Sequence, residues 1–186
     1  MKKLSRFSLV ILLLAYSKLS AAQIPGNNTG KATIVKSQAI NAAAISGKGL
    51  VVADSVLKVV SIEDKYQVGV SVVSRSKIND KTPADAIIHD VVTEVYHIVE
   101  GSGILLVGGT LDSPVQIPAG SAIVKKITGP SSTGKKINGG TQYEVGPGDV
   151  VVIPPNTPHG FIELITNTIV YTLIRIDSEK VLELKN

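Results

Sequence analysis

The sequence has 186 residues, with 19 lysines and arginines against 15 aspartates and glutamates, no cysteine and no tryptophan. Four of the basic residues and none of the acidic ones lie in residues 1–22, so the rest of the chain is neutral overall. This balance argues against nucleic-acid binding, which needs a clustered excess of positive charge. The lack of cysteine excludes disulfide bonds, so packing or a metal ion must hold together a chain long enough for one domain.

Residues 1–22 have the features of a secretory signal peptide. Basic residues start the segment, residues 7–16 are almost wholly apolar, and small residues at positions 20–22 precede Gln23. The apolar run is too short to cross a bilayer as a helix, which argues against the alternative of an uncleaved anchor. We therefore expect an exported protein, periplasmic or secreted, with no membrane attachment after cleavage.

Residues 23–48 are predicted to be a lead-in to the main domain. Residues 23–31 are polar and rich in glycine, which is typical of a loop. The stretch 36–49 carries four alanines and two isoleucines, and Gly47 stands where a helix would end. This pattern predicts one short N-terminal helix.

Residues 49–186 change to short runs rich in β-branched residues, separated by glycine, proline, asparagine and aspartate. Many short strands with turn residues between them indicate an all-β sandwich or barrel. Residues 110–140, rich in glycine, serine, proline and lysine, are predicted to be an extended excursion between two halves of the sheet. The predicted strands cover residues 55–62, 66–75, 86–89, 94–99, 103–108, 122–127, 149–154, 159–165 and 168–176.

The three histidines of the chain lie in two short segments. His89 and His97 belong to AIIHDVVTEVYHIVEGSG, and His159 belongs to GPGDVVVIPPNTPHGF. Each segment has a polar residue at the mouth of a strand, beside a turn and a glycine. Histidine and carboxylate side chains that meet inside a barrel are natural ligands of a divalent first-row metal ion.

The two segments resemble the paired motifs of the cupin superfamily, and in particular small single-domain bacterial cupins with an RmlC-like jelly-roll barrel. In the second segment the spacing from Gly148 through Pro154 to His159 fits the family motif, with Asn156 at a position where the family usually has glycine. Asparagine tolerates the left-handed backbone conformation that glycine provides. The resemblance implies a cupin-type jelly-roll barrel over residues 49–186.

In the first segment His89, Glu94 and Gly101 match the family's second histidine, glutamate and glycine, but Ile87 replaces its first histidine. The resemblance therefore implies a metal site of His89, Glu94 and His159. Two imidazoles and one carboxylate suit non-heme iron, and three protein ligands with an open position also suit catalytic zinc. The divalent ion could be Fe, Mn, Ni or Zn. The alternative is a degenerate site that binds an organic ligand without metal.

Side chains alternate between the two faces of a strand, and this alternation predicts which neighbours of Glu94 point into the barrel. If Glu94 points into the barrel, Tyr96 does so too, and His97 points to the outside. His97 is therefore expected outside the barrel or in a contact between subunits.

Three residues are candidates for a substrate pocket, namely Ile87, Tyr96 and Phe161. Phe161 is in phase with His159 on the following strand. The Tyr96 hydroxyl could bond a ligand or be satisfied within the core, and the sequence leaves both open. For Arg175 a salt bridge at the rim or at an interface is favoured over binding of a substrate carboxylate.

Two classes of function remain open. In the first, an exported enzyme with one divalent metal ion uses Glu94 as ligand or general base in an oxygenase, isomerase or lyase reaction on a small organic molecule. In the second, a non-catalytic cupin binds a small molecule, which Ile87 and the lack of a further acid–base pair favour. A homodimer is expected in both cases, because valine-rich edge strands would aggregate if left open.

Overall fold

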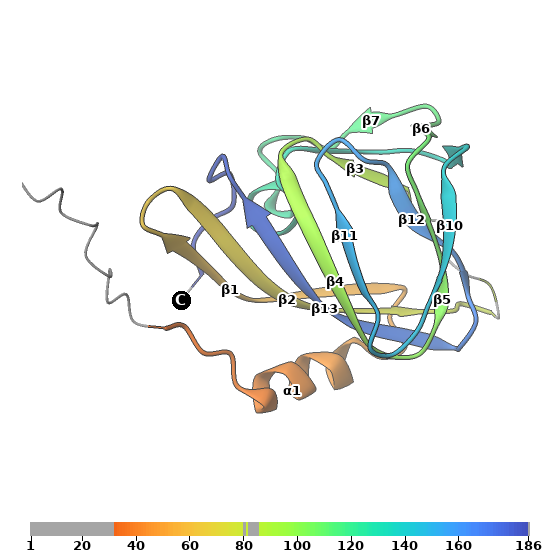
Figure 1. The fold of residues 1–186 in the computed structure, drawn as a ribbon, viewed down its shortest axis with the longest axis horizontal. Coiled ribbons are helices and arrows are strands. Elements are labelled where there is room, and N and C mark those ends of the chain that lie inside the picture. The colour runs from red at the N-terminus through yellow and green to blue at the C-terminus, as the bar shows by residue number, and fades with distance from the viewer. Residues whose placement is uncertain (1–31, 80, 82–85, 186) are drawn as a thin grey trace, which may run out of the picture. The chain divides into compact units, whose positions relative to one another are not determined.

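The computed structural model describes residues 32–79, 81 and 86–185, so the predicted signal peptide and residues 23–31 of the lead-in lie outside the described residues. The described residues form an antiparallel β-barrel of the jelly-roll type with one α-helix, α1 Ser37–Gly47 (Figure 1). The prediction of an all-β jelly-roll barrel with one short N-terminal helix is confirmed. None of the helices in this part of the chain is long and apolar enough to cross a bilayer.

Two antiparallel sheets make up the barrel (Figure 1). The first has the order β1-β2-β13-β4-β11, with β1 Val52–Ile62, β2 Tyr66–Ser76, β13 Thr168–Asp177, β4 Val92–Glu100 and β11 Val150–Ile153. The second has the order β10-β5-β12-β3-β8-β7, with β10 Thr141–Val145, β5 Gly103–Val107, β12 His159–Leu164, β3 Ile87–His89, β8 Ser131–Thr133 and β7 Val115–Gln116. A small third sheet pairs β6 Thr110–Leu111 with β9 Ile137–Asn138. The predicted site residues therefore come from both main sheets, Glu94 from the first and the two histidines from the second.

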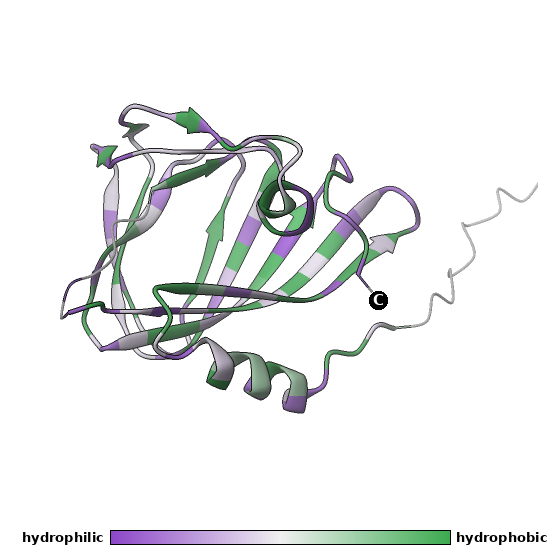
Figure 2. Ribbon diagram, turned by 180° about the vertical axis from the view of Figure 1, so that it is seen from behind, coloured by the Kyte–Doolittle hydropathy of each residue, from purple (hydrophilic) through white to green (hydrophobic). Residues whose placement is uncertain are grey.

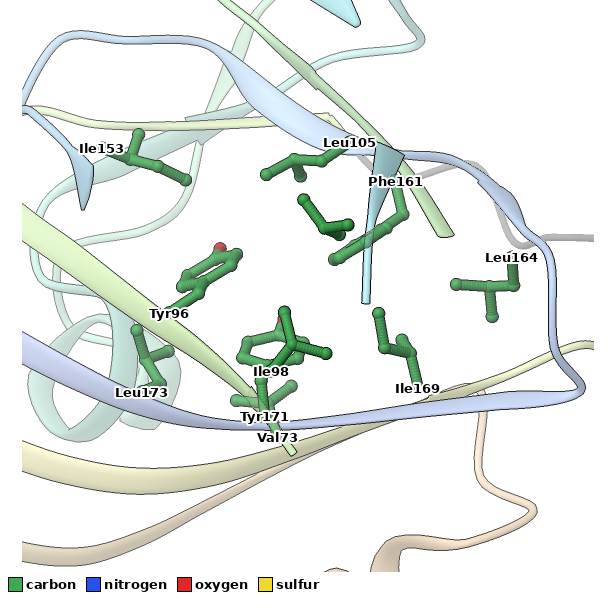
Figure 3. Packing of buried hydrophobic residues seen from close by; sticks show 11 residues of the cluster. Val73, Tyr96, Ile98, Leu105, Ile153, Phe161, Leu164, Ile169, Tyr171 and Leu173 are labelled. Carbon is green, nitrogen blue, oxygen red and sulfur yellow. The ribbon is translucent and has the colours of Figure 1, made fainter. Parts of the chain in front are cut away.

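The core lies between the two main sheets. Hydrophobic and hydrophilic residues alternate along the long strands, as the bands of colour in Figure 2 show, so each strand presents one apolar face to the interior. Tyr96 and Tyr171 stack at the centre with their ring centroids 4.4 Å apart, and Figure 3 shows them surrounded by aliphatic side chains. The buried cluster consists of Val73, Tyr96, Ile98, Leu105, Val145, Ile153, Phe161, Leu164, Ile169, Tyr171 and Leu173.

Helix α1 covers part of the outer face of the first sheet. Its Ala43 packs against Val72 of β2 and Val170 of β13. At its end, a Cβ atom on Gly47 would lie 2.7 Å from the Oγ atom of Ser74. The glycine at the predicted end of the helix thus allows the helix to approach the sheet.

The prediction of a strand over residues 122–127 is wrong, because this segment forms the π-helical turn η1 Val124–Thr128. The Lys125 N–H donates to the Ser121 carbonyl at 3.1 Å, and the Gly129 N–H donates to the Val124 carbonyl at 3.0 Å. The turn ends at Gly129, whose φ of 65° favours glycine. Hydrogen bonds within the turn therefore replace the sheet partners that its β-branched residues had suggested.

The rest of the predicted excursion, residues 110–140, contains short strands that the sequence pattern did not reveal. One of them, β8, pairs with β3, and in this register His89 lies opposite Ser131. The excursion therefore builds the back wall of the histidine site.

A C-terminal segment, residues 178–185, runs from β13 to β1 and η1. The carboxylate of Asp177, which is fully buried, accepts a hydrogen bond from the Leu182 N–H at 2.8 Å. Further along, the Glu183 N–H donates to the Lys125 carbonyl at 2.8 Å, and Lys185 forms a bridge with Val59. This segment therefore fastens η1 to the edge of the first sheet.

Candidate metal centre

His89 is the last residue of β3, and its ring is held in place by the segment that joins η1 to β8. Its Nδ1 atom lies 3.0 Å from the Thr128 carbonyl oxygen and 2.8 Å from the Ser131 hydroxyl. A carbonyl oxygen only accepts hydrogen bonds, so Nδ1 carries the proton and Nε2 keeps its lone pair. The Ser131 hydroxyl agrees with this assignment, because it donates its own proton to a carbonyl, that of Gly129, at 2.9 Å.

His159 begins β12, directly after the proline-rich corner. Its Nδ1 atom lies 2.9 Å from the Thr157 carbonyl oxygen, which again leaves the Nε2 lone pair without a proton. Asn156 in this corner has a φ of 57°, the left-handed conformation expected from its place in the motif. The Asn156 N–H donates to the His89 carbonyl at 2.7 Å, and this bond joins the two histidine segments.

Glu94, on the inner face of β4, lies between the two imidazoles. Its Oε1 atom is 3.4 Å from the His89 Nε2 atom, and its Oε2 atom is 3.4 Å from the His159 Nε2 atom. One candidate ligand atom from each residue lies within 4.8 Å of the others. The exposed fractions of His89, Glu94 and His159 are 4%, 2% and 2%, so bulk water does not solvate the cluster.

The chemistry of these atoms fits a cation. With both Nδ1 atoms protonated, each Nε2 atom faces a carboxylate oxygen, and two acceptors that face each other repel. Among the described residues, the buried Nε2 atom of His159 has no hydrogen-bond partner. A divalent ion bound by these atoms would satisfy them, because neutral imidazole and carboxylate are its usual ligands. The residues present therefore fit a metal ion.

Glu94 also accepts hydrogen bonds from two other side chains. The Tyr96 hydroxyl donates to Oε2 at 2.9 Å, and the Arg175 Nε–H donates to Oε1 at 3.1 Å. Burial alone would raise the pKa of the Glu94 carboxyl. The positive charges of His89, when protonated in acid, and of Arg175 outweigh burial and hold this pKa well below its usual value. Glu94 is therefore an anion at neutral pH.

Tyr96 lines the cavity and at the same time completes the core. Burial, and secondly the charge of Glu94, raise the pKa of its phenol well above 10. The phenol is therefore a neutral donor to Glu94. Of the two readings left open by the sequence, this geometry matches the core aromatic whose hydroxyl is satisfied within the protein.

Arg175 lies inside the barrel, so the expectation of a salt bridge at the rim or at an interface is wrong. Its exposed fraction is 3%, and it lies opposite Glu94 in the β13–β4 register. Its Nη1 atom donates to the Ser71 hydroxyl at 2.9 Å, and its Nη2 atom donates to the carboxylate of Asp54. The sequence did contain a signal for this inward position, because Arg175 shares a strand face with Tyr171 and Leu173. The partners could not be inferred because Asp54 lies 121 positions away along the chain.

The cluster lies in the wall of a cavity of about 400 Å³. Ile87 and Tyr96, two of the three predicted pocket residues, line this cavity. The remaining lining is half aliphatic, with Val52, Val73, Ile117, Ile123, Ile127 and Leu173, and half polar, with Asp54, Arg75, Thr128, Thr133, Tyr171 and Arg175. Five of these lining residues, which no sequence pattern identified, come from the excursion: Ile117, Ile123, Ile127, Thr128 and Thr133.

Phe161 and His97 do not belong to the cluster of His89, Glu94 and His159. Phe161 faces the interior, as expected from its phase with His159, but it packs in the core cluster and is not among the residues that line the cavity. The guanidinium of Arg75, which does line the cavity, lies 5.8 Å from the centre of the Phe161 ring. His97 is exposed on the outer face of β4, as alternation predicted.

Comparison with known proteins gives a partial family match and several likenesses of fold. Residues 136–185, which include β11, the proline-rich corner, His159 and Arg175, match the model of the AraC-like ligand binding domain. No curated protein matches the sequence.

Among solved structures, the BH2720 protein of Bacillus halodurans is similar, with 14% identity and a TM-score of 0.48 over 80% of this chain and 84% of that chain. An oxalate oxidase in complex with glycolate gives 18% identity and a TM-score of 0.45 over 84% of this chain and 65% of that chain. The cupin domain of Cnp3 from Schizosaccharomyces pombe gives 10% identity and a TM-score of 0.39 over 68% and 61% of the two chains. These likenesses concern the fold alone.

Proposed function

We propose that the protein binds one divalent metal ion through His89, Glu94 and His159 and acts on a compact, partly apolar organic molecule in the adjoining cavity. The observation that carries the proposal is the convergence of two imidazole Nε2 lone pairs on one buried carboxylate. Each imidazole is locked by a carbonyl at Nδ1, as is usual behind a metal-binding histidine.

The metal ion, Glu94 and the cavity wall would have different roles in the proposed function. When bound, a divalent ion with open positions acts as a Lewis acid or brings substrate and oxygen together. Glu94 suits the role of ligand better than that of general base, because its pKa is depressed and both of its oxygens already accept hydrogen bonds. The aliphatic side chains of the cavity wall would contact the apolar part of the substrate. Oxygenase, isomerase and lyase chemistry all remain compatible with this arrangement.

A non-catalytic binding protein is the second candidate, and one observation favours it. The Arg175 Nε–H already donates to Glu94, so the carboxylate has a positive partner without any metal ion. The match to a ligand-binding domain over residues 136–185 is in keeping with this alternative. In that case the cavity would hold an organic ligand beside an Arg175–Glu94 ion pair.

Metal binding is tested with a matched pair of histidine variants. We expect the parent protein to contain or take up Fe, Mn, Ni or Zn, and to unfold at a higher temperature when the metal is added. The His159→Asn variant should lose this metal-dependent shift. The His97→Asn variant, which removes an exposed imidazole from the same barrel, should keep it. A parent protein that takes up none of the four metals would refute the metal site.

Turnover is tested separately on the metal-loaded protein. Oxygen uptake and product formation are measured with diketones, phenols and small sulfur-containing acids. Saturable binding of a compound without any conversion would support the non-catalytic alternative.

We also propose that the protein is exported and forms a homodimer. The segment 1–22 supports export, and the test is fractionation of cells that express the whole chain. For the dimer, Val150 and Val152 of the edge strand β11 are each 61% exposed. Size-exclusion chromatography with light scattering should give a dimer mass, and replacement of both valines by lysine should give a monomer.

A further inference from the structure

The Glu94 carboxylate belongs to a buried chain of charges that runs away from the histidines. Arg175 bridges two acids, since its Nε–H donates to Glu94 at 3.1 Å and its Nη2–H donates to Asp54. Ser71 fixes the guanidinium from β2 by accepting from Nη1 at 2.9 Å. The side chains of Arg175 and Asp54 are 4% and 16% exposed, so water screens this chain of charges weakly.

In the metal-free protein, the buried negative charge of Glu94 needs a positive partner. A buried carboxylate without a counter-charge strongly destabilises a folded protein, as does the loss of one partner of a buried ion pair. The two histidines cannot supply this charge while they are neutral. Arg175 does supply it, through its Nε–H bond to Oε1 of Glu94. The same positive charge also acts against a cation at the histidine side, because it lies next to the only acidic ligand.

We propose that Arg175 is an internal counter-ion of Glu94, which stabilises the barrel in the absence of metal and lowers the affinity of the centre for a divalent ion. This inference rests on the proposed metal site. Arg175 acts through Glu94 and is therefore a positioning residue. Asp54 works in the opposite sense, since its negative charge neutralises part of the Arg175 charge and makes the centre more favourable for a cation.

Three substitutions separate this role from a merely structural one. In Arg175→Met the charge is removed while a long side chain remains, and Tyr96 still holds Oε2 of Glu94. In Asp54→Asn the charge of the second acid is removed at a more exposed position. Lys48→Met is the control, because it removes a positive charge from an exposed ion pair with Glu100. Zinc affinity of each purified variant is measured by competition with a chromophoric chelator, and stability of the metal-free form by urea unfolding.

The two charge changes should move zinc affinity in opposite directions. Arg175→Met should bind zinc on the order of tenfold or more tightly than the parent, and Asp54→Asn should bind it more weakly by a similar factor. Metal-free Arg175→Met should unfold at a lower urea concentration than the parent, whereas Lys48→Met should match the parent in both measurements. Arg175→Lys, which keeps the charge, should bring zinc affinity back towards that of the parent.

Several results would overturn the inference while leaving the metal site intact. One is weaker or unchanged zinc binding by Arg175→Met, since a purely structural role predicts weaker binding in both variants. If Arg175→Met does not fold, Asp54→Asn still tests the inference, because zinc binding equal to or tighter than that of the parent refutes it. Absence of zinc binding in every form would instead refute the affinity half of this inference, and the proposed function would fall as well if the parent took up none of Fe, Mn and Ni. The urea data on the metal-free forms would still decide the stabilising half.

Discussion

Ile87 lies directly opposite His159 in the β3–β12 ladder, and it shares a strand face with His89 two residues further on. Its side chain lines the cavity beside both imidazoles. An aliphatic side chain therefore lies next to the candidate metal centre, at the position where the cupin motif that this segment resembles has its first histidine. The cavity wall is apolar at this position as a result.

Replacement of Ile87 by histidine should add a ligand at this position. We expect zinc affinity to rise about tenfold or more, because a third imidazole would complete the protein part of the coordination sphere. Competition with a chelator measures the change. Ile88→His is the matched control, since its side chain points to the other face of β3. Equal affinities for the two variants would show that position 87 does not reach the metal.

Acid should weaken the metal-free protein through Glu94. The pKa of Glu94 is lowered in the folded state, so the unfolded chain takes up a proton first as the pH falls below the usual glutamate value of about 4.3. The contribution of ionised Glu94 to stability is fully present above that value and is lost as the pH falls towards the lower folded pKa. Urea unfolding between about pH 3 and 7 should show this loss.

The Glu94→Gln variant tests the assignment of this acid dependence. It should lose less stability than the parent over the same pH range, because the amide does not titrate. Glu100→Gln, which changes an exposed glutamate, should keep the parent's dependence. If Glu94→Gln lost as much stability in acid as the parent, another group would be responsible for the pH dependence.

Loss of the Tyr96 hydroxyl should destabilise the protein. Tyr96→Phe removes the donor to Glu94 Oε2, and a hydrogen bond to a charged partner contributes about 1.5–3 kcal/mol. The free energy of unfolding in urea measures the effect. Tyr143→Phe is the control, because Tyr143 is 49% exposed and its hydroxyl should contribute little. An unchanged stability of Tyr96→Phe would mean that water replaces the phenol at Glu94.

Asp177 should be required to hold the C-terminal segment. Asp177→Ala leaves the buried Leu182 N–H without its acceptor, which costs about 1–3 kcal/mol. Limited proteolysis should then cut within residues 178–185 faster than in the parent. Glu179→Ala, a change at a neighbouring exposed residue, should leave the cleavage rate unchanged. Equal rates for the parent and Asp177→Ala would refute this anchoring role.

Local patterns were enough to predict the barrel and to place the cluster residues. The alternation of β-branched residues marked the long strands, and the resemblance of two segments to the paired cupin motifs singled out His89, Glu94 and His159, which the structure brings together. The alternation of apolar and polar residues is set by residues that are close together in the chain, so it can be recognised in a single sequence.

Features that depend on contacts distant in sequence could not be predicted. Strand β10, Thr141–Val145, was missed because only two of its five residues, Tyr143 and Val145, are apolar, which is too short an alternation to mark a strand. The segment of η1 has strand-like composition, but its own hydrogen bonds and Gly129 decide its conformation. The Asp54–Arg175–Glu94 chain of charges joins three strands, and no local signal identifies such partners.

The path of residues 178–185 has a practical consequence for recombinant production. Lys185 borders a groove that it shares with Asp54 and Ile127, and both of these residues also line the cavity. A polyhistidine purification tag fused after this end would bring additional imidazoles close to these two cavity-lining residues. Such a tag could compete for the very ions under study, so a handle made of other residues, or one removed by a protease, is the better choice for measuring metal content.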